Sequence, residues 1–497
     1  MRQFRLKYFL LSILTGFLVA LSFPKLNAFY LTWIAFVPLI YSALRNCVKN
    51  SLIYGFLAGF VCNAAALYWI FPFMLYNTDS ISQSIIVSVL LWSYLALYFS
   101  LWSGFLSFTR RHLYPFLSII FAACSWIALE FLRTYFLTGF PWNLLGYTQS
   151  PFLQIIQIAD VLGSYGISFA IICVNMLLYY WLYSKANRRR YLLISALIIT
   201  VLIGYGLIRM SRFNSSYGEK LNAGIVQPNI DQYKKWNNDY KIEIIKTLEE
   251  SAKFFEDKER DIIVYPETAL PGFLQNNDET DIQNMIKNIS NSQNISLIGA
   301  PSLTKNKIYN SVFAVSSKEV INIHDKNHLV VFGEYIPFKK LLSKFFGVLN
   351  SLGDFSKGSV MQVYSCGKIV VGPTICSENF FPSLSRNLVL NGAKILTNHT
   401  NDAWFFDTFA PYQHFVMNIF RAVENRKNII ISANSGLSGI IDSSGNTVLK
   451  TQINQSINVS GSVYQNDYIT IYTKFGDFFA VMCISVTLFI LVIIFII

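Results

Sequence analysis

Apolar runs divide the chain into two kinds of sequence. A membrane-spanning helix needs about 20 mostly apolar residues, and stretches of this kind crowd the first 211 residues and close the chain. The predicted spans are 8–23, 27–45, 51–76, 82–108, 114–137, 162–184, 191–209 and 475–497. The pattern predicts a polytopic helical membrane bundle of about eight transmembrane helices, built from residues 1–211 and 474–497.

The first predicted span follows three basic residues, Arg2, Arg5 and Lys7. A signal peptide is the alternative interpretation of such a start. Further apolar spans follow at once, and no clear small-residue cleavage site is visible. We therefore expect the first span to be retained as a helix.

Residues 212–473 have a different pattern, in which short β-rich runs recur and helical stretches such as 240–257 and 413–426 lie between some of them. The runs are 221–226, 261–265, 295–298, 311–315, 368–375, 394–397, 428–433, 438–441 and 457–463. This mixture predicts a separate α/β domain with several strands buried on both faces.

Composition and charge support the membrane interpretation. Hydrophobic residues make up 53% of the chain and charged residues 14%, whereas soluble proteins are about one-quarter charged. The net charge of +12 invites a nucleic-acid interpretation. However, 14 of the 40 basic residues but only three of the 28 acidic residues lie in 1–211, so the excess belongs to the membrane part and not to a nucleic-acid surface.

The basic residues also predict a topology. The loops on one side carry 11 of them, at positions 2, 5, 7, 45, 49, 110, 111, 185 and 188–190, and the loops on the other side carry four, at 25, 133, 209 and 212. Cytoplasmic loops are enriched in Lys and Arg. We therefore expect cytoplasmic termini and an α/β domain on the outer side of the membrane.

Two of the seven cysteines, Cys366 and Cys376, lie in the α/β domain. Residues 366–368 resemble a hairpin turn and 368–375 its outgoing strand. At roughly 3.3 Å per residue the two cysteines would lie about 30 Å apart, too far for a disulfide. Cys376 is therefore expected to be a free thiol. The other five, at 47, 62, 124, 173 and 483, are interpreted as small buried residues of the apolar spans.

Three sites follow β-rich runs, where α/β proteins place their working residues. Glu267 follows a strand that ends at Pro266, Lys326 precedes an apolar stretch that ends at Glu334, and Cys376 ends a buried strand two residues before Glu378. Taken singly, each has a plain structural interpretation. These are a surface carboxylate, a lysine paired with Asp325 or Glu334, and an inert buried cysteine.

Together the three residues suggest acyl-transfer chemistry. A thiol becomes a good nucleophile when it loses its proton, and a nearby carboxylate can take that proton and return it. A lysine cation can stabilise the thiolate and a tetrahedral oxyanion. The five histidines form no ligand cluster, and no glycine-rich phosphate loop is visible. We therefore predict neither a metal nor another cofactor.

The motifs resemble those of the nitrilase (carbon–nitrogen hydrolase) superfamily. The resemblance rests on Tyr-Pro-Glu-Thr-Ala at 265–269, Lys-x-x-Leu-Val-x-Phe-Gly-Glu at 326–334 and Cys-x-Glu at 376–378. Gly-Phe-Pro-Trp-Asn at 139–143, Val-Gln-Pro-Asn-Ile at 226–230, Asn-Asp-Ala-Trp at 401–404 and Arg-Ala-Val-Glu-Asn-Arg at 421–426 extend it. Over essentially its whole length the chain resembles the apolipoprotein N-acyltransferase family.

This resemblance implies an αββα sandwich for the domain and a set of roles. Cys376 would form a thioester with an acyl group from a membrane phospholipid, chiefly phosphatidylethanolamine, and pass it to the α-amino group of diacylglyceryl-cysteine on an apolipoprotein. Glu267 would act as base and acid, and Lys326 would stabilise charge. Glu334 and Glu378 would support them, and Trp236 would lie near the substrate. The enzyme would sit in the bacterial inner membrane with its domain in the periplasm.

Two positions depart from the family pattern: Ser377 replaces an aromatic residue and Val331 replaces proline. Residues 338–350 are apolar with basic interruptions. They predict either an arm that dips into the membrane through Phe345 and Phe346 or a helix packed on the domain. A membrane-tethered amidase with water as acceptor remains an alternative function, as does a catalytically dead assembly protein.

Overall fold

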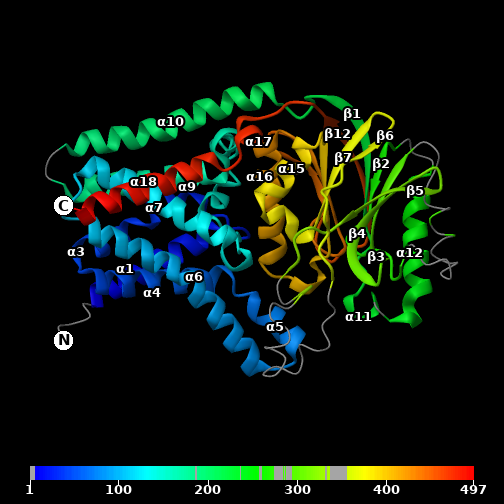
Figure 1. The fold of residues 1–497 in the computed structure, drawn as a ribbon, viewed down its shortest axis with the longest axis horizontal. Coiled ribbons are helices and arrows are strands. Elements are labelled where there is room, and N and C mark those ends of the chain that lie inside the picture. Colours follow the sequence, from blue (N-terminus) through cyan, green and yellow to red (C-terminus); the bar gives the residue numbers. More distant parts are fainter. Residues whose placement is uncertain are drawn as a thin grey trace. The chain divides into compact units, whose positions relative to one another are not determined.

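A computed structural model of the chain describes residues 6–184, 187–235, 237–256, 260–273, 284, 286, 294–330, 333–335 and 355–496 (Figure 1). The chain forms two compact units. The helical unit contains Met1–Ser211, Thr408–Val416 and Phe475–Ile497, and the α/β unit contains Arg212–Asp407 and Met417–Lys474. The grouping of Thr408–Val416 with the helical unit is not visible in the sequence pattern.

The helical unit is built from apolar helices. They are α1 (Leu6–Ser22), α2 (Thr32–Ala35), α3 (Val37–Arg45), α4 (Val48–Ala66), α5 (Ile70–Thr78), α6 (Ile81–Thr109), α7 (Pro115–Tyr135), α8 (Leu153–Ile156), α9 (Ala159–Tyr183), α10 (Arg188–Arg212) and α18 (Phe478–Ile496). Each of the eight predicted spans overlaps one or two of them, so the predicted positions of the apolar helices agree with the structure.

The number of membrane-spanning helices differs from the prediction. Within the described residues, five helices are long and apolar enough to cross a membrane, and a sixth span results if the pair α4 and α5, bent by 65°, is counted as one. The predicted spans at 8–23 and 27–45 correspond to shorter apolar helices. The second of these is interrupted at Phe36, just before α3 begins with Val37 and Pro38. The exact count of eight is therefore not confirmed.

Small residues allow the central helices of this unit to approach closely. A Cβ atom on Gly55 of α4 would lie 2.6 Å from the carbonyl oxygen of Phe99 on α6. One turn later, a Cβ on Gly59 would lie 2.8 Å from Cα of Ala96. Gly-x-x-x-Gly spacing supports such packing where no hydrophobic effect drives helices together. This contact fixes α4 against α6.

Two buried charged residues of α7 hold the connection that follows this helix. Glu130 accepts a hydrogen bond from the backbone N–H of Leu145 at 2.7 Å, and Arg133 donates to the carbonyl of Asn143 at 3.2 Å. Both side chains are buried.

The prediction that the five cysteines of the apolar spans are buried is wrong for one of them, because Cys47, at the start of α4, is exposed.

The α/β unit contains two six-stranded sheets. The first has the order β12-β1-β2-β3-β4-β5 and the second the order β11-β10-β9-β8-β7-β6. The strands of the first sheet are β1 (Glu219–Gln227), β2 (Ile262–Val264), β3 (Ile295–Thr304), β4 (Lys307–Ser316), β5 (Glu319–Asp325) and β12 (Ile457–Gln465). Those of the second are β6 (Tyr364–Cys366), β7 (Ile369–Ile375), β8 (Ile395–Thr400), β9 (Ile429–Ala433), β10 (Gly439–Ile441) and β11 (Thr447–Lys450).

The sheets face each other across a shared core. Fully buried Ile225, Val264 and Val312 of the first sheet belong to the same apolar cluster as Val371 and Ile430 of the second. On the other face of the first sheet, a second cluster joins it to α12 (Lys241–Lys253). Helices α15 (Pro382–Leu390) and α16 (Ala410–Asn425) lie beside the second sheet in Figure 1. The layers therefore agree with an αββα arrangement.

All nine predicted strands are present, and the prediction missed three further strands of the described residues. The missed strands β5, β6 and β11 are short or lie at a sheet edge. The predicted hairpin at 366–368 is present, because β6 ends at Cys366 and β7 begins at Ile369. Gly367 has a φ of +55° in this turn, a value that glycine adopts readily. Both cysteines of the unit are free thiols.

Strand directions explain why the predicted site residues converge. In the first sheet β1, β2 and β3 are parallel, and two antiparallel pairings bring β5 back to the same direction. In the second sheet β7, β8 and β9 are parallel. The carboxyl ends of β2 and β5 therefore lie at one edge of the first sheet, as do those of β7 and β8 in the second. Chain segments leaving these ends carry the candidate site.

Candidate active site

The turn after β2 places Glu267. Pro266 ends the strand, and the turn then packs tightly against β3. A Cβ atom on Gly299 would lie 2.2 Å from the carbonyl oxygen of Pro266 and 2.8 Å from Cα of Glu267. Only glycine permits this approach. The position of the carboxylate therefore depends on a strand more than 30 residues later in the sequence.

The Glu267 carboxylate is buried and held on both oxygens. Its Oε1 accepts a hydrogen bond from Nδ2 of Asn310 at 2.7 Å and lies 3.4 Å from Nζ of Lys326. Its Oε2 accepts from the backbone N–H of Asn401 at 2.9 Å. These three contacts come from β4, from the end of β5 and from the end of β8. The carboxylate is thus fixed by both sheets.

Lys326 lies between two carboxylates. Its ammonium group donates to Oε1 of Glu334 at 2.9 Å, in addition to the contact with Glu267, and its side chain is 1% exposed. Burial alone would lower the pKa of Lys326, but the carboxylates of Glu334 and Glu267 raise it overall above the ordinary value. Lys326 therefore keeps its positive charge inside the domain.

Asn310 connects the two carboxylates that flank Lys326. Its Nδ2 donates both to Glu267 at 2.7 Å and to Glu334 at 2.9 Å. Oε2 of Glu334 accepts in turn from the backbone N–H of Val330 at 2.9 Å. An amide on one strand thereby sets the spacing between the two negative charges and the lysine.

Cys376 occupies the turn directly after β7. Its φ of +49° is uncommon for a residue with a side chain, and its carbonyl accepts a hydrogen bond from Nδ2 of Asn398 at 3.2 Å. The residue is half-buried. Burial raises the pKa of the Cys376 thiol well above its usual range, Glu267 adds to this, and Lys326 acts in the opposite direction. The thiol is therefore within electrostatic reach of both partners and is protonated at neutral pH.

Glu378 ties the cysteine turn to the lysine segment. Its Oε2 accepts from the backbone N–H of Ile375 at 2.8 Å, and its Oε1 accepts from the backbone N–H groups of Asn327 and His328. Burial alone would raise its pKa, but the contact with His324 and these backbone donors lower it overall. An ionised carboxylate therefore joins the end of β7 to the end of β5.

Arg421 and Glu424 hold the other side of the cysteine turn. Both side chains are fully buried on α16, and the guanidinium binds the carboxylate through two contacts of 2.8 Å. Arg421 also donates to the carbonyls of Asn379 and Phe380, which follow Cys376. The Arg-Ala-Val-Glu-Asn-Arg motif on α16 therefore stabilises the turn that carries Cys376.

The sequence pattern did not reveal a second buried lysine. Lys235, at the end of α11 (Gln232–Lys235), is 1% exposed, and its Nζ donates to the carbonyl of Glu267 at 3.1 Å. Burial lowers its pKa to about 8, although Glu267 and Cys376 act in the opposite direction. Among the described residues, a carboxylate ion pair is not found for this lysine.

The structure brings together Glu267, Lys326, Cys376, Glu334 and Glu378, all of which the sequence pointed to. Asn310, Lys235 and the backbone of Asn401 also belong to this cluster, and no sequence motif singled out the first two. Trp236, Phe345, Phe346 and the whole predicted arm at 338–350 lie outside the described residues, as does Val331.

Comparisons with known proteins agree with this arrangement. Residues 15–177 match the apolipoprotein N-acyltransferase N-terminal domain, and residues 222–456 match the carbon-nitrogen hydrolase domain. An apolipoprotein N-acyltransferase of Geobacter metallireducens is 35% identical over 492 residues, covering 96% of this chain and 93% of the relative. One of Rickettsia prowazekii is 31% identical over 464 residues, covering 88% of each chain. The chain is thus a membrane-bound enzyme of the carbon–nitrogen hydrolase superfamily and belongs to the apolipoprotein N-acyltransferase family.

Proposed function

We propose that this protein transfers a fatty acyl group from a membrane phospholipid to the N-terminal α-amino group of diacylglyceryl-cysteine on apolipoproteins. The donor is chiefly phosphatidylethanolamine. The observation that carries the proposal is the placement of a protonated thiol, a fixed carboxylate and a permanently charged lysine at the carboxyl ends of three strands. The two lipid substrates are inferred from membership of the apolipoprotein N-acyltransferase family.

In the first half-reaction, Sγ of Cys376 attacks the carbonyl carbon of the donor ester. Because burial raises the pKa of the thiol, the attack needs a base, and Glu267 takes the proton. The carbonyl oxygen becomes an oxyanion that Lys326 stabilises. The C–O bond then breaks, Glu267 returns the proton to the leaving oxygen, and a lysophospholipid departs from a thioester on Cys376.

In the second half-reaction, the lipoprotein amine attacks the thioester carbon. Glu267 takes a proton from the attacking nitrogen, and Lys326 again faces the oxyanion. The C–S bond breaks, the proton passes to sulfur, and the product is an amide. The free thiol is then ready for another donor. Two substrates therefore use one carboxylate in turn, in a ping-pong cycle.

The supporting residues act through these groups. Glu334 and Asn310 position Lys326 and Glu267 through contacts of 2.7–2.9 Å. Glu378 holds the cysteine turn against the lysine segment. Their role is to keep the reacting groups at fixed spacing before a lipid arrives.

The proposed location is the bacterial inner membrane, with the α/β unit in the periplasm and both termini in the cytoplasm. The asymmetric distribution of Lys and Arg among the loops supports this orientation. Cys47 offers a direct test because it is exposed and lies between Arg45 and Lys49 in a predicted cytoplasmic loop. A membrane-impermeant maleimide should label it in inverted membrane vesicles and not in intact spheroplasts. Labelling in intact spheroplasts and not in inverted vesicles would show that this loop faces the periplasm and would contradict the proposed orientation.

The function is tested by incubating the purified chain with a fluorescent phosphatidylethanolamine and a diacylated lipopeptide. The expected results are transfer of the labelled chain to the peptide amine and, without peptide, an acyl adduct on Cys376 detected by mass spectrometry. Cys376→Ala should abolish both. Cys366→Ala is the matched control, because Cys366 is the other thiol of the unit and contacts Ser316 instead of the site.

The alternative functions give different results in this assay. A membrane-tethered amidase would use water as acceptor and release free fatty acid or cleave amides without acylating the peptide. A catalytically dead assembly protein would form no adduct on Cys376. Either result would contradict the proposed acyl transfer.

A further inference from the structure

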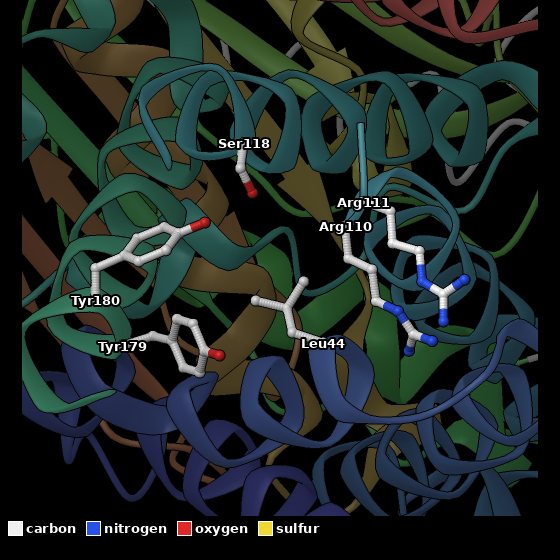
Figure 2. Close-up of a pocket in the computed structure, with 6 residues that line it drawn as sticks. All are labelled: Leu44, Arg110, Arg111, Ser118, Tyr179 and Tyr180. Carbon is white, nitrogen blue, oxygen red and sulfur yellow. The ribbon is translucent and has the colours of Figure 1, made fainter. Parts of the chain in front are cut away.

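A cavity in the helical unit shares no lining residue with the candidate active site and has no part in the proposed reaction. Its volume is about 320 Å³, and its lining residues are Leu44, Arg110, Arg111, Ser118, Tyr179 and Tyr180. They come from α3, from the connection between α6 and α7, from the first turn of α7 and from the end of α9. Figure 2 shows the hydroxyl groups of Ser118 and the two tyrosines directed toward the middle, with both arginines on the opposite side.

The charge in this cavity is not balanced by the protein. Residues 1–211 contain only three carboxylates, Asp79, Glu130 and Asp160. Asp160 pairs with Arg209 at 2.5 Å, and Glu130 binds the backbone of Leu145. In the part of the chain that the structure describes, neither Arg110 nor Arg111 has a carboxylate within ion-pair distance. Two guanidinium groups beside one cavity therefore lack an anion.

The remaining lining residues favour a phosphate group, which has acceptor oxygens on several sides. Guanidinium groups bind phosphate through paired charged hydrogen bonds. The buried hydroxyl of Ser118 and those of Tyr179 and Tyr180 add neutral donors from the other side of the cavity. The volume of the cavity lies at the lower end of the range for small-ligand pockets, about 300–1,000 Å³. A tetrahedral phosphate with a small ester substituent fits this combination of size and donors.

The rim of the cavity indicates where such a phosphate would come from. The residues that begin α7 next to Ser118 are strongly exposed and apolar: Tyr114 is 81% exposed and Phe116 is 72% exposed. Leu44 adds an apolar wall inside. In a membrane-bound protein, exposed apolar side chains at a helix end face lipid. A phospholipid could thus place its headgroup on the arginines and its acyl chains along these side chains.

Simple topology control by positive charge explains these arginines less well. The run Arg188, Arg189 and Arg190 carries three charges at the start of α10, in a segment predicted to face the cytoplasm, and these three arginines are not among the residues that line this cavity. A topology signal needs charge in the loop but no cavity beside it. Arg110 and Arg111 have both the charge and the cavity beside it.

We propose that this cavity is a binding site for a phosphate group, supplied by the headgroup of an anionic phospholipid on the side of the bundle that carries the basic loops. The site is distinct from that of the acyl donor, and its occupancy does not require the acyl-transfer reaction. Lipid bound here joins α3, α6, α7 and α9 and so stabilises the folded bundle.

The experiment uses the full-length chain in detergent and measures binding of short-chain phosphatidylglycerol by native mass spectrometry. The variant is R110Q/R111Q, and the matched control is R189Q/R190Q, which removes the same charge from the first turn of α10 on the same predicted side. The wild type and the control should bind one more lipid than R110Q/R111Q, with Kd values at least about tenfold lower. R110K/R111K should restore part of the affinity, which also shows that loss is not a failure to fold.

A parallel measurement with inorganic phosphate distinguishes the two sources of the ligand. If phosphate raises the unfolding temperature of the wild type and displaces the lipid, while failing to act on R110Q/R111Q, the site takes free phosphate as well. If phosphate does not compete, the lipid headgroup is the ligand. Equal lipid binding by R110Q/R111Q and the wild type, or an equal loss in both double variants, would overturn the proposal.

Discussion

Two buried lysines approach Glu267 from different sides and lie in opposite electrostatic surroundings. Lys326 faces the carboxylates of Glu267 and Glu334, which raise its pKa above the ordinary value. Lys235 faces the carbonyl of Glu267, and burial lowers its pKa to about 8. Equal burial therefore leaves one amine permanently charged and the other able to lose its proton. What a buried lysine can do depends on the carboxylates beside it more than on the depth of burial.

The largest expected effect separates the two lysines directly. Lys326→Met should lower kcat about a thousandfold, because it removes the cation that faces the oxyanion. Lys235→Met should lower kcat about tenfold or less, since it removes a contact to a backbone carbonyl. Steady-state rates of acyl transfer to a lipopeptide measure both. Equal losses would show that the difference in surroundings has no functional meaning, and thermal unfolding of each variant controls for loss of structure.

The next effect is a pH dependence of stability that Lys235 should cause and Lys326 should not. Its pKa is about 8 in the folded chain and 10.5 ordinarily, so between these values the unfolded state binds more protons than the folded state. The free energy of unfolding should therefore rise with pH across this window, by up to about 3 kcal/mol. Chemical unfolding of the wild type and of Lys235→Met over this range isolates the contribution. A difference between the two proteins that stays constant with pH would contradict the low pKa.

A substitution at Glu334 should make the surroundings of Lys326 more like those of Lys235. Glu334→Gln removes one of the two negative charges, so the pKa of Lys326 should fall. Turnover should drop about thirtyfold, equivalent to ~2 kcal/mol, and the loss should grow as the pH rises because the lysine deprotonates earlier. The measurement is the pH profile of kcat. A loss that is independent of pH would assign Glu334 a purely structural role.

The smallest effect concerns the amide that spaces the two carboxylates. Asn310→Ala removes two hydrogen bonds but no charge, so kcat should fall about fivefold, or ~1 kcal/mol. Asn322→Ala on the neighbouring strand β5 is the control, since Asn322 bonds only the backbone next to it among the contacts described. If both variants behave alike, Asn310 does not set the spacing around Lys326.

The sequence pointed to Glu267 and Cys376 because each follows a strand that has its own local pattern, and strand ends are where parallel sheets collect functional groups. Lys326 follows β5, which was not predicted, and was singled out because Lys326 and Glu334 flank an apolar stretch. Lys235 gave no such signal. It follows Lys234 in a polar stretch, yet Lys234 is 44% exposed and pairs with Glu243, while Lys235 is buried. Which of two adjacent lysines turns inward depends on the packing of α11, and that packing is not encoded in local periodicity.

The strands were predicted about as completely as the site residues. Strands that are almost entirely buried, such as β7 and β9, were found because each begins with three consecutive Ile or Val residues. The edge strands β5 and β11 were missed because their apolar residues are few and interrupted by polar ones, and part of each strand is exposed. Asn310 was missed for a related reason, since a single polar residue in a strand does not indicate which groups lie across the sheet. The grouping of Thr408–Val416 with the helical unit is likewise a tertiary effect.

The carboxylate of Glu378 has a consequence for how the enzyme can change during a cycle. Because it binds backbone N–H groups on both sides, at Ile375 and at Asn327 and His328, the nucleophile and the cation belong to one rigid piece. Neither can shift to suit a bulkier or longer lipid without breaking buried charged hydrogen bonds. Adaptation to different fatty chains must therefore occur in chain segments that do not carry the reacting atoms.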